Sequence, residues 1–133
     1  MADKATLPVL PLAGHRHILL AVSGGSDSTA LLHLAAWQRQ TLANPPQITA
    51  VTVDHRLRSG STAEARAVET MCAALGIRHM ILAWEGDKPT SGIQDAARNA
   101  RRSLIAAAAV RIGADIVFTG HTYDDQLETV AMR

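Results

Sequence analysis

Residues 17–28 read HILLAVSGGSDS, an uninterrupted apolar run that leads into glycines and hydroxyl residues. The apolar part, residues 17–22, has the length and aliphatic content of a strand buried on both faces. Helical spacing begins at Asp27 and continues to about Leu42, before Pro45. A buried strand that turns through glycines directly into a helix is typical of parallel α/β folds, in which such turns bind ligands.

The rest of the chain repeats this alternation of strand and helix. Expected strands cover 48–53, 78–84 and 114–119, and expected helices cover about 61–75, 94–112 and 124–133. Ser61 and Glu64 form a capping-box pattern at the start of the second helix. Short strand–helix connections require parallel strands with right-handed crossovers. We therefore expect a single α/β domain over residues 1–133, a parallel sheet with helices on both faces in a three-layer sandwich.

Composition places the chain among globular proteins. Of its 133 residues, 47% are hydrophobic and 19% charged, and the net charge of +1 gives no global field for nucleic acid. The single cysteine, Cys72, excludes internal disulfides and is interpreted as a small buried hydrophobe. Histidines such as His33 and His79 lack the paired spacing of a zinc site. The longest apolar run, 104–110, is too short to span a membrane, and residues 1–4 do not begin a signal peptide. A cytoplasmic location without membrane contact is expected.

Polar clusters follow three of the expected strands. They lie at residues 23–28, 54–58 and 120–125. Ligands of parallel sheets bind beyond the carboxyl ends of the strands, near the point where strand order reverses. The three clusters are therefore expected to converge on one site.

The first cluster has the features of a phosphate-binding turn. Glycines without a Cβ let backbone N–H groups approach an anion, and a helix amino terminus adds donors with a partial positive charge. The turn lacks the Gly-Lys-Ser/Thr of a Walker A motif and is not GxGxxG. The carboxylate of Asp27 would repel phosphate unless Mg²⁺ lay between them; the alternative is a plain turn in which Asp27 caps the helix. Phosphate binding is assigned to Ser23, Gly24, Gly25, Ser26, Asp27 and Ser28.

SGGSDS resembles the signature of the PP-loop ATP pyrophosphatases. This resemblance implies a sheet related to the adenine-nucleotide hydrolase group and an enzyme that adenylates its substrate and releases pyrophosphate. Two further segments, VDHRLR at 53–58 and GHTYDDQLET at 120–129, resemble the VDHxLR and GHxxDDQxET elements of tRNA(Ile)-lysidine synthetases. Gln94, Ala97, Arg98 and Arg101 fit their Q..AR..R pattern, whereas Arg102 departs from the aromatic residue common there. The resemblance covers about 18–133 and implies an amino-terminal catalytic domain without the later domains that hold tRNA.

The resemblance also implies roles for individual residues. Catalysis is assigned to Asp27, Asp125, Arg98 and Arg101; ATP binding, besides the turn, to Asp54, His55, Gly120 and His121; and Mg²⁺ binding to Asp27, Asp125 and Glu128. On the expected last helix, Asp125 and Glu128 are three residues apart and so share a face. The alternatives are a solvated turn for Asp54, a helix-terminal carboxylate for Asp125 or Glu128, a solvent-facing pair with Asp95 for the arginines, and a structural histidine at His121.

The reaction implied by this family has two steps. The position-2 carbonyl oxygen of the wobble cytidine, in the anticodon loop of an isoleucine tRNA, attacks the α-phosphate of ATP and pyrophosphate leaves. The amine of free L-lysine then displaces AMP. The resemblance allows a homodimer. The alternatives are a tRNA cytidine thiolase, which the lone Cys72 disfavours, a guanosine-monophosphate synthetase-like amination, which the motifs fit poorly, and a non-catalytic adenine-nucleotide sensor, which would need no metal.

Overall fold

The computed structural model describes residues 12–23, 25–57, 60–119 and 127–129, with the backbone alone at 26, 27 and 127–129. The elements are β1 (His17–Ala21), α1 (Ser26–Arg39), β2 (Gln47–Asp54), α2 (Ser61–Leu75), β3 (Arg78–Ala83), α3 (Ile93–Ile112), β4 (Ile116–Thr119) and β5 (Leu127–Thr129). Within these ranges every helix is too short or too polar to cross a bilayer. The strands and the first three helices lie where the sequence predicts them, with ends that differ by a few residues.

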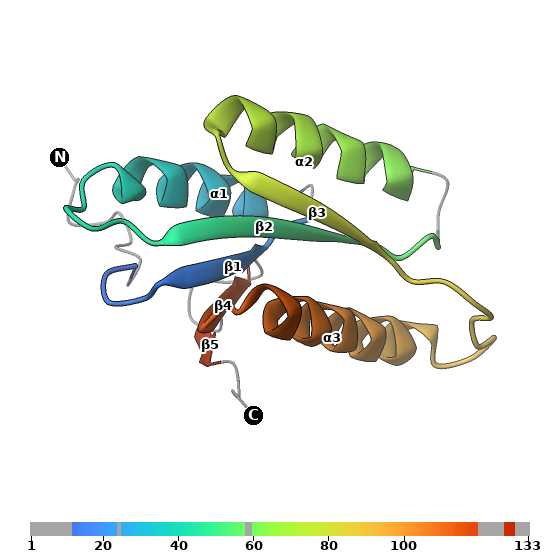
Figure 1. Ribbon diagram of the computed structural model, residues 1–133. Helices are drawn as coiled ribbons and strands as arrows, with labels where there is room; N and C mark the ends of the chain where they lie inside the picture. The colour runs from blue at the N-terminus through green and yellow to red at the C-terminus, as the bar shows by residue number, and fades with distance from the viewer. Residues whose placement is uncertain (1–11, 24, 58–59, 120–126, 130–133) are drawn as a thin grey trace, which may run out of the picture.

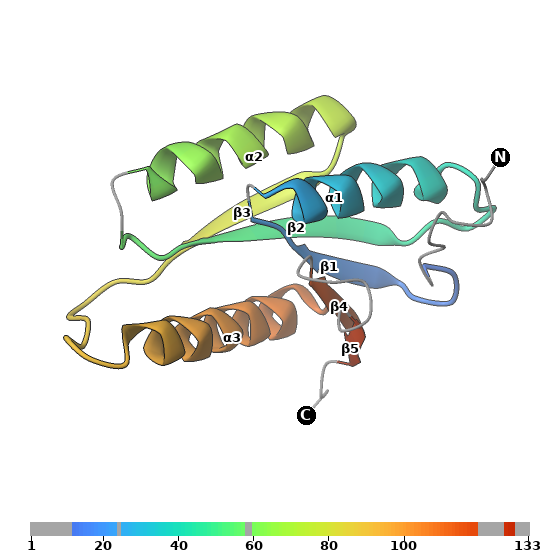
Figure 2. The same cartoon turned by 180° about the vertical axis from the view of Figure 1, so that it is seen from behind.

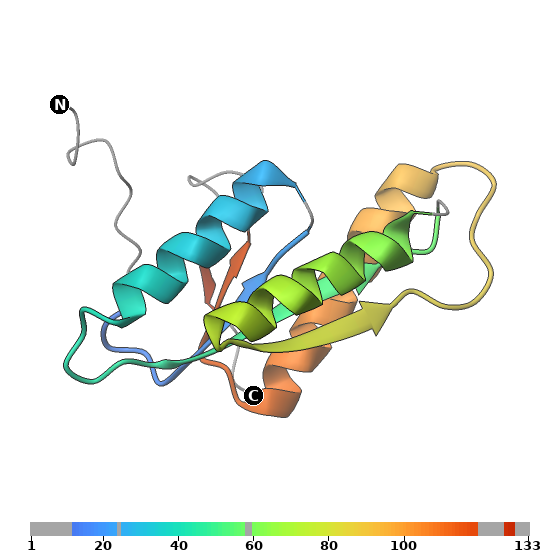
Figure 3. The same ribbon diagram turned by 90° about the horizontal axis from the view of Figure 1, so that it is seen from above.

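The strands form one sheet in the order β3-β2-β1-β4-β5. β1 to β4 are mutually parallel, and β5 pairs antiparallel with β4. α1 and α2 cover one face of the sheet, and α3 covers the other (Figures 1 and 2). Seen from above, α1 and α2 lie next to each other on their face (Figure 3). The expected three-layer α/β sandwich is confirmed.

Two apolar clusters join these layers. Ile18, Leu20 and Phe118 face α1 and α2, where they pack with Leu31 and Val68. Leu19, Val51 and Val117 face α3, where they pack with Ile105 and Ala108. Successive residues of a strand point to opposite faces, so a central strand covered on both sides must be apolar throughout. The run at residues 17–22 is explained by this double burial.

Cys72 lies inside the α1–α2 layer. Its side chain is 0% exposed, and burial raises the pKa of its thiol to about 11. A thiol in this environment stays protonated and chemically inert. The interpretation of Cys72 as a small buried hydrophobe is confirmed.

The helix expected at 124–133 is wrong over residues 127–129. These residues form β5, in which Leu127 pairs with Phe118 and Glu128 pairs with Val117. The pairing satisfies backbone N–H and C=O groups on the outer edge of β4, which would otherwise have no ladder partner. The shared helix face that was expected for Asp125 and Glu128 is therefore not formed at Glu128.

The capping box expected at Ser61 and Glu64 is also wrong. The N-cap of α2 is Gly60, and no side chain that the structure describes caps the helix. Ser61 is the first helical residue, and its hydroxyl donates a 2.6 Å hydrogen bond to Oδ1 of Asp54 at the end of β2. Ser61 therefore lies one position past the N-cap, and its hydroxyl donates a charge-assisted hydrogen bond to the buried carboxylate.

Candidate functional site

The four parallel strands end at the same edge of the sheet, and all three helices begin there (Figure 1). β1 lies between β2 and β4, and the helices that follow β1 and precede β4 lie on opposite faces. The reversal of strand order therefore falls between β1 and β4, which is where such sheets bind ligands. The polar residues after β1 and β2 share this edge, as predicted. The cluster at 120–125 follows β4 in sequence but lies outside the described residues.

The turn between β1 and α1 is held by serine hydroxyls. Val22 extends the pairing with β2 by donating its N–H to the carbonyl of Val51 at 2.8 Å. The hydroxyl of Ser23 then donates to Oγ of Ser28 at 3.1 Å and accepts the N–H of Gly25 at 3.1 Å. Ser28 is only 4% exposed. The hydroxyl of Ser23 thus ties both sides of the turn together and fixes where α1 begins.

Helix α1 begins without a side-chain cap. Its N-cap is Gly25, with φ −76° and ψ 167°, a conformation open to any residue. An N-cap side chain ordinarily accepts N–H groups of the first turn; Gly25 has none, and no other side chain that the structure describes takes that place. The N–H groups of the first turn and the positive end of the helix dipole therefore lie at the carboxyl edge of the sheet. This is the arrangement of an anion-binding site.

Asp54 ends β2 as a buried carboxylate and is 3% exposed. Its Oδ1 accepts hydrogen bonds from the Ser61 hydroxyl at 2.6 Å and the Arg56 N–H at 3.1 Å, and its Oδ2 accepts the Thr62 hydroxyl at 2.7 Å. The hydrogen bond from Ser61 lowers the pKa of Asp54, and those from Thr62 and Arg56 add to it, against burial, which raises it. The solvated turn considered for Asp54 is therefore wrong.

Asp54→Asn is expected to cost about 1–3 kcal/mol of unfolding free energy at neutral pH, because an amide cannot accept all three hydrogen bonds. The folded-state pKa of Asp54 is lowered, so its contribution is complete above the ordinary pKa of about 3.9 and is lost as the pH falls. Denaturant unfolding at several pH values should show the wild type and variant converging below about pH 4. Asp87→Asn, at an exposed carboxylate, is the control. A constant difference across pH would contradict the prediction.

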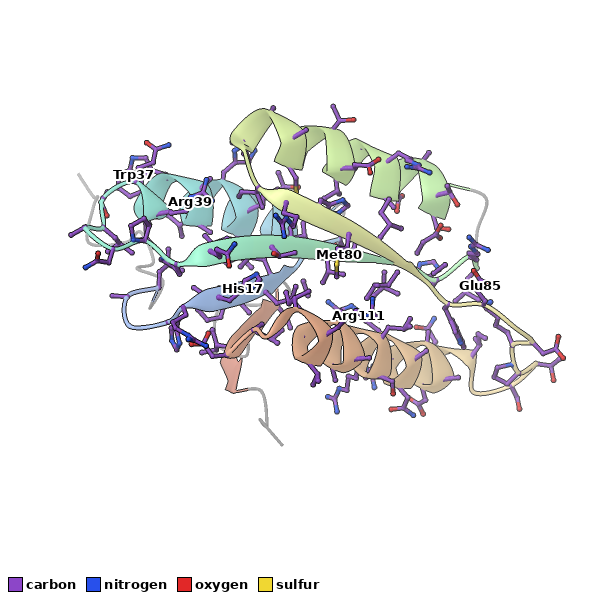
Figure 4. All side chains as sticks on the ribbon, in the orientation of Figure 1. His17, Trp37, Arg39, Met80, Glu85 and Arg111 are labelled. Atoms are coloured by element: carbon purple, nitrogen blue, oxygen red, sulfur yellow. The ribbon has the colours of Figure 1, made fainter. Side chains whose placement is uncertain are left out.

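The loop after Asp54 turns sharply. Arg56 has φ 56°, a left-handed conformation that is uncommon outside glycine. Its guanidinium lies 3.9 Å from Oδ2 of Asp54 and 3.7 Å from Oε2 of Glu85, which follows β3. Glu85 lies beyond the carboxyl end of β3, at the end of the molecule opposite Trp37 (Figure 4). Through this turn the Leu57 N–H donates back to Nδ1 of His55 at 3.1 Å.

The two arginines proposed for catalysis lie on α3, on the opposite face of the sheet from α1. Arg98 is 64% exposed and forms a 3.4 Å ion pair with Asp95, three residues earlier. This is the solvent-facing pair that was weighed as its alternative. Arg101 is half-buried. Their role in catalysis stays a prediction.

The remaining predicted site residues are described in part or not at all. Asp27 lies in the first turn of α1, and Glu128 lies in β5, both by their backbones. Gly24, Gly120, His121 and Asp125 lie outside the described residues. Among the side chains that the structure does describe, no group of three His, Cys, Asp or Glu could hold a metal.

The sequence patterns did not predict the two hydroxyl groups that donate hydrogen bonds to Asp54. Ser61 and Thr62 lie seven and eight residues beyond it. A signal was present, since a carboxylate that ends a strand was followed by two hydroxyl residues in the first turn of the next helix. The capping-box pattern concealed it by assigning Ser61 to its own helix.

Comparison with known proteins gives a family match and close relatives. The PP-loop domain model matches residues 2–133. The chain is 56% identical over 116 residues to a tRNA(Ile)-lysidine synthase of Rhodopseudomonas palustris, covering 87% of this chain and 34% of that protein. It is 52% identical over 132 residues to one of Bradyrhizobium sp., covering 99% and 37%. The chain thus spans about a third of the length of these relatives.

Among solved structures, a U34-tRNA thiolase from Methanococcus maripaludis, with its [4Fe-4S] cluster, has a similar fold. The TM-score is 0.74 at 20% sequence identity, and the match covers 86% of this chain and 41% of that one. At this identity the similarity concerns the fold alone. It agrees with the parallel sheet and its helical layers.

Proposed function

Because the chain belongs to the PP-loop domain family, we propose that it binds ATP with the phosphates at the start of α1 and releases pyrophosphate while adenylating a substrate. The observation that carries this proposal is the amino terminus of α1, which has a glycine as its N-cap and lies behind the turn that Ser23 and Gly25 form. Its donors face the edge where parallel sheets bind ligands. Gly24, Ser26 and Ser28 complete the phosphate-binding turn.

The turn contributes most to the reaction when the bond between the α- and β-phosphates breaks. Negative charge then grows on the departing pyrophosphate, and donors that are already oriented stabilise this charge without reorganising. The hydrogen bonds of Ser23 to Ser28 and Gly25 provide that orientation, because they fix the turn before ATP arrives. We also assign nucleotide contacts to Gly120 and His121, which follow β4 in the sequence.

We assign Mg²⁺ as cofactor, held by Asp27, Asp125 and Glu128. Carboxylate oxygens are the ligands that Mg²⁺ prefers, and the ion neutralises the charge of the phosphates it binds. Asp27 supports this assignment by position, because its backbone lies in the first turn of α1, beside the proposed phosphates. Without a cation there, its charge would oppose phosphate binding.

The proposed substrate is the wobble cytidine of an isoleucine tRNA. It is supported by the relatives named tRNA(Ile)-lysidine synthase and by the segments around Asp54 and Asp125. The carbonyl oxygen of the base attacks the α-phosphate, and the amine of free L-lysine then attacks the activated carbon, losing a proton as AMP leaves. Arg98 and Arg101 supply cations to the reacting phosphate or to the anticodon backbone. We place the reaction in the cytoplasm and allow a homodimer.

Pyrophosphate exchange tests the proposal. The protein, incubated with ATP, labelled pyrophosphate and unmodified isoleucine tRNA, should return label to ATP only when the tRNA is present. With lysine added, mass analysis of the tRNA nucleosides should show a cytidine heavier by one lysine less water. Exchange that ignores tRNA, or a cytidine of unchanged mass, would contradict the assigned substrate. No exchange with any substrate would favour a nucleotide sensor.

A tRNA thiolase is the second candidate, because one has the same fold. Sulfur transfer usually draws on pairs of reactive cysteines, and this sequence has Cys72 alone. Its thiol is buried with a raised pKa of about 11. Since the thiolate is the reactive form, Cys72 cannot take that role. The lysine ligation is favoured by the relatives named tRNA(Ile)-lysidine synthase.

A further inference from the structure

The hydrogen bonds around Asp54 reveal what its carboxylate does. Three donors already occupy the two oxygens, and Thr62 and Ser61 belong to the next helix. The carbonyl of Asp54 is also engaged, accepting the Trp84 N–H at 2.9 Å. A carboxylate that is 3% exposed and bonded in this way has little left to offer a ligand. The group of Asp54, Ser61 and Thr62, here called the Asp54 cluster, instead fastens the end of β2 to the start of α2.

The same cluster sets the course of the loop. Oδ1 of Asp54 binds the N–H of Arg56, which adopts the left-handed turn that brings the Leu57 N–H back towards His55. A backbone N–H can only donate, so Nδ1 of His55 must be the acceptor. The neutral ring then carries its proton on Nε2. The hydrogen bond of one ring nitrogen usually decides whether the other carries the proton. The loop therefore fixes one tautomer of His55.

The position of His55 relates it to the phosphate turn. β1 and β2 are paired neighbours, with Ala21 opposite Val51. Asp54 lies three residues beyond Val51, so the end of β2 stands about 10 Å farther out along the strand direction than that pair. His55 is half-buried at this end. It thus lies at the same carboxyl edge as the phosphate-binding turn, at the end of the strand that pairs with β1.

We propose that Asp54 is a positioning residue, and that the contact with ATP is made by His55 as a neutral donor through Nε2–H, held in that tautomer by the Asp54 cluster. This proposal rests on the proposed function, since it takes ATP to be the ligand. It replaces the direct binding role expected for Asp54. An acceptor nitrogen or oxygen of the nucleotide receives the hydrogen bond.

A matched pair of substitutions separates the two ring nitrogens. In His55→Asn the amide oxygen can replace Nδ1 as acceptor for the Leu57 N–H, but no distal donor remains. In His55→Gln the amide nitrogen reaches the place of Nε2 and keeps the donor. Calorimetric titration of the protein with ATP should show about tenfold weaker binding for His55→Asn, and at most about threefold weaker binding for His55→Gln. Arg56→Gly, which keeps the backbone N–H and suits φ 56°, should bind as the wild type does.

The tautomer of His55 can be measured directly, and it would not change if Asp54 served only the stability of the fold. ¹⁵N NMR of histidine-labelled protein at mildly alkaline pH should show the neutral ring of His55 protonated on Nε2 in the absence of ATP. Thr62→Val removes one hydroxyl donor from the Asp54 cluster and should yield a mixture of tautomers with weaker ATP binding, even though position 62 is exposed.

The outcomes distinguish this inference from the proposed function. If the wild type does not bind ATP, the proposed function fails, whatever the tautomer. If the wild type binds ATP and His55→Asn equals His55→Gln, the contact through Nε2–H is overturned. A ring protonated on Nδ1 overturns the tautomer assignment, and this measurement on the wild type does not depend on whether any variant folds. Unchanged tautomer and ATP affinity in Thr62→Val would overturn the positioning role of Asp54.

Discussion

Gly25→Ala is expected to lower ATP binding and pyrophosphate release by on the order of 100-fold while leaving the fold intact. An N-cap side chain stands over the first-turn N–H groups of its helix, so a methyl group at this position would occupy the approach of the phosphates. The backbone at Gly25 is extended, and among the described residues an added Cβ would meet only Oγ of Ser23, at an ordinary 3.5 Å. The unfolding free energy should therefore change by less than about 1 kcal/mol.

Gly113→Ala is the matched control with the opposite expectation. Gly113 caps the end of α3 with φ 76°, a conformation that alanine adopts only with strain, so this variant should lose about 1 kcal/mol of stability. Gly113 lies at the end of α3 that is far from the carboxyl edge of the sheet. The Gly113→Ala variant should therefore bind ATP normally. Calorimetric titration and thermal unfolding of both variants decide the matter. If Gly25→Ala bound ATP as tightly as Gly113→Ala, phosphates could not lie at the start of α1.

The sequence predicts the layers of this fold well because burial on both faces leaves a local signature. Residues 18–22 and 48–53 are continuous apolar or β-branched runs, and each ends where a polar cluster begins. The turn from β1 into α1 is equally local, since the glycines and the first helical residues are adjacent in the chain. Features that depend on neighbouring residues were therefore predicted with the correct type and order.

Contacts between distant residues account for the differences. β5 forms because Leu127 and Glu128 meet the free edge of β4, and no local pattern in 124–133 distinguishes that pairing from a helix. Ser61 fits a capping box by spacing, yet Asp54, seven residues earlier, is the acceptor that it reaches in the fold. Hydrogen-bond partners of this kind are set by the packing of α2 on β2, which spacing alone does not give.

The candidate site also contains features that neighbouring residues determine and features that depend on contacts in the fold. The serines and glycines of the phosphate turn were predicted as a unit, and the structure holds Ser23, Gly25 and Ser28 together. Asp54 was predicted at the correct edge, but its burial and its hydrogen-bond donors become visible only in the fold, and its role toward ATP stays a prediction. A polar residue at a strand end thus identifies the edge that binds the ligand, whereas its hydrogen-bond partners decide whether it contacts that ligand or supports a residue that does.

Asp125→Ala is expected to reduce pyrophosphate release by about 100- to 1000-fold without unfolding the protein. The proposed Mg²⁺ would lose one of its carboxylates, and the phosphates would then be held beside Asp27 with less compensating charge. Raising the Mg²⁺ or Mn²⁺ concentration should recover part of the rate, since a weakened metal site fills at higher concentration. Exchange of labelled pyrophosphate into ATP measures both effects.

Asp124→Ala is the control for Asp125→Ala, because it removes an identical charge from the adjacent position. A general loss of negative charge would affect both variants alike, whereas a metal ligand must stand at one position with its oxygens on the ion. Asp124→Ala should therefore lose much less activity and show no added dependence on Mg²⁺. Near-normal exchange in Asp125→Ala, or equal losses in both variants that metal does not relieve, would remove Asp125 from the metal site. The anion-binding role of the α1 terminus would stand unaffected, because it depends on backbone donors that neither substitution alters.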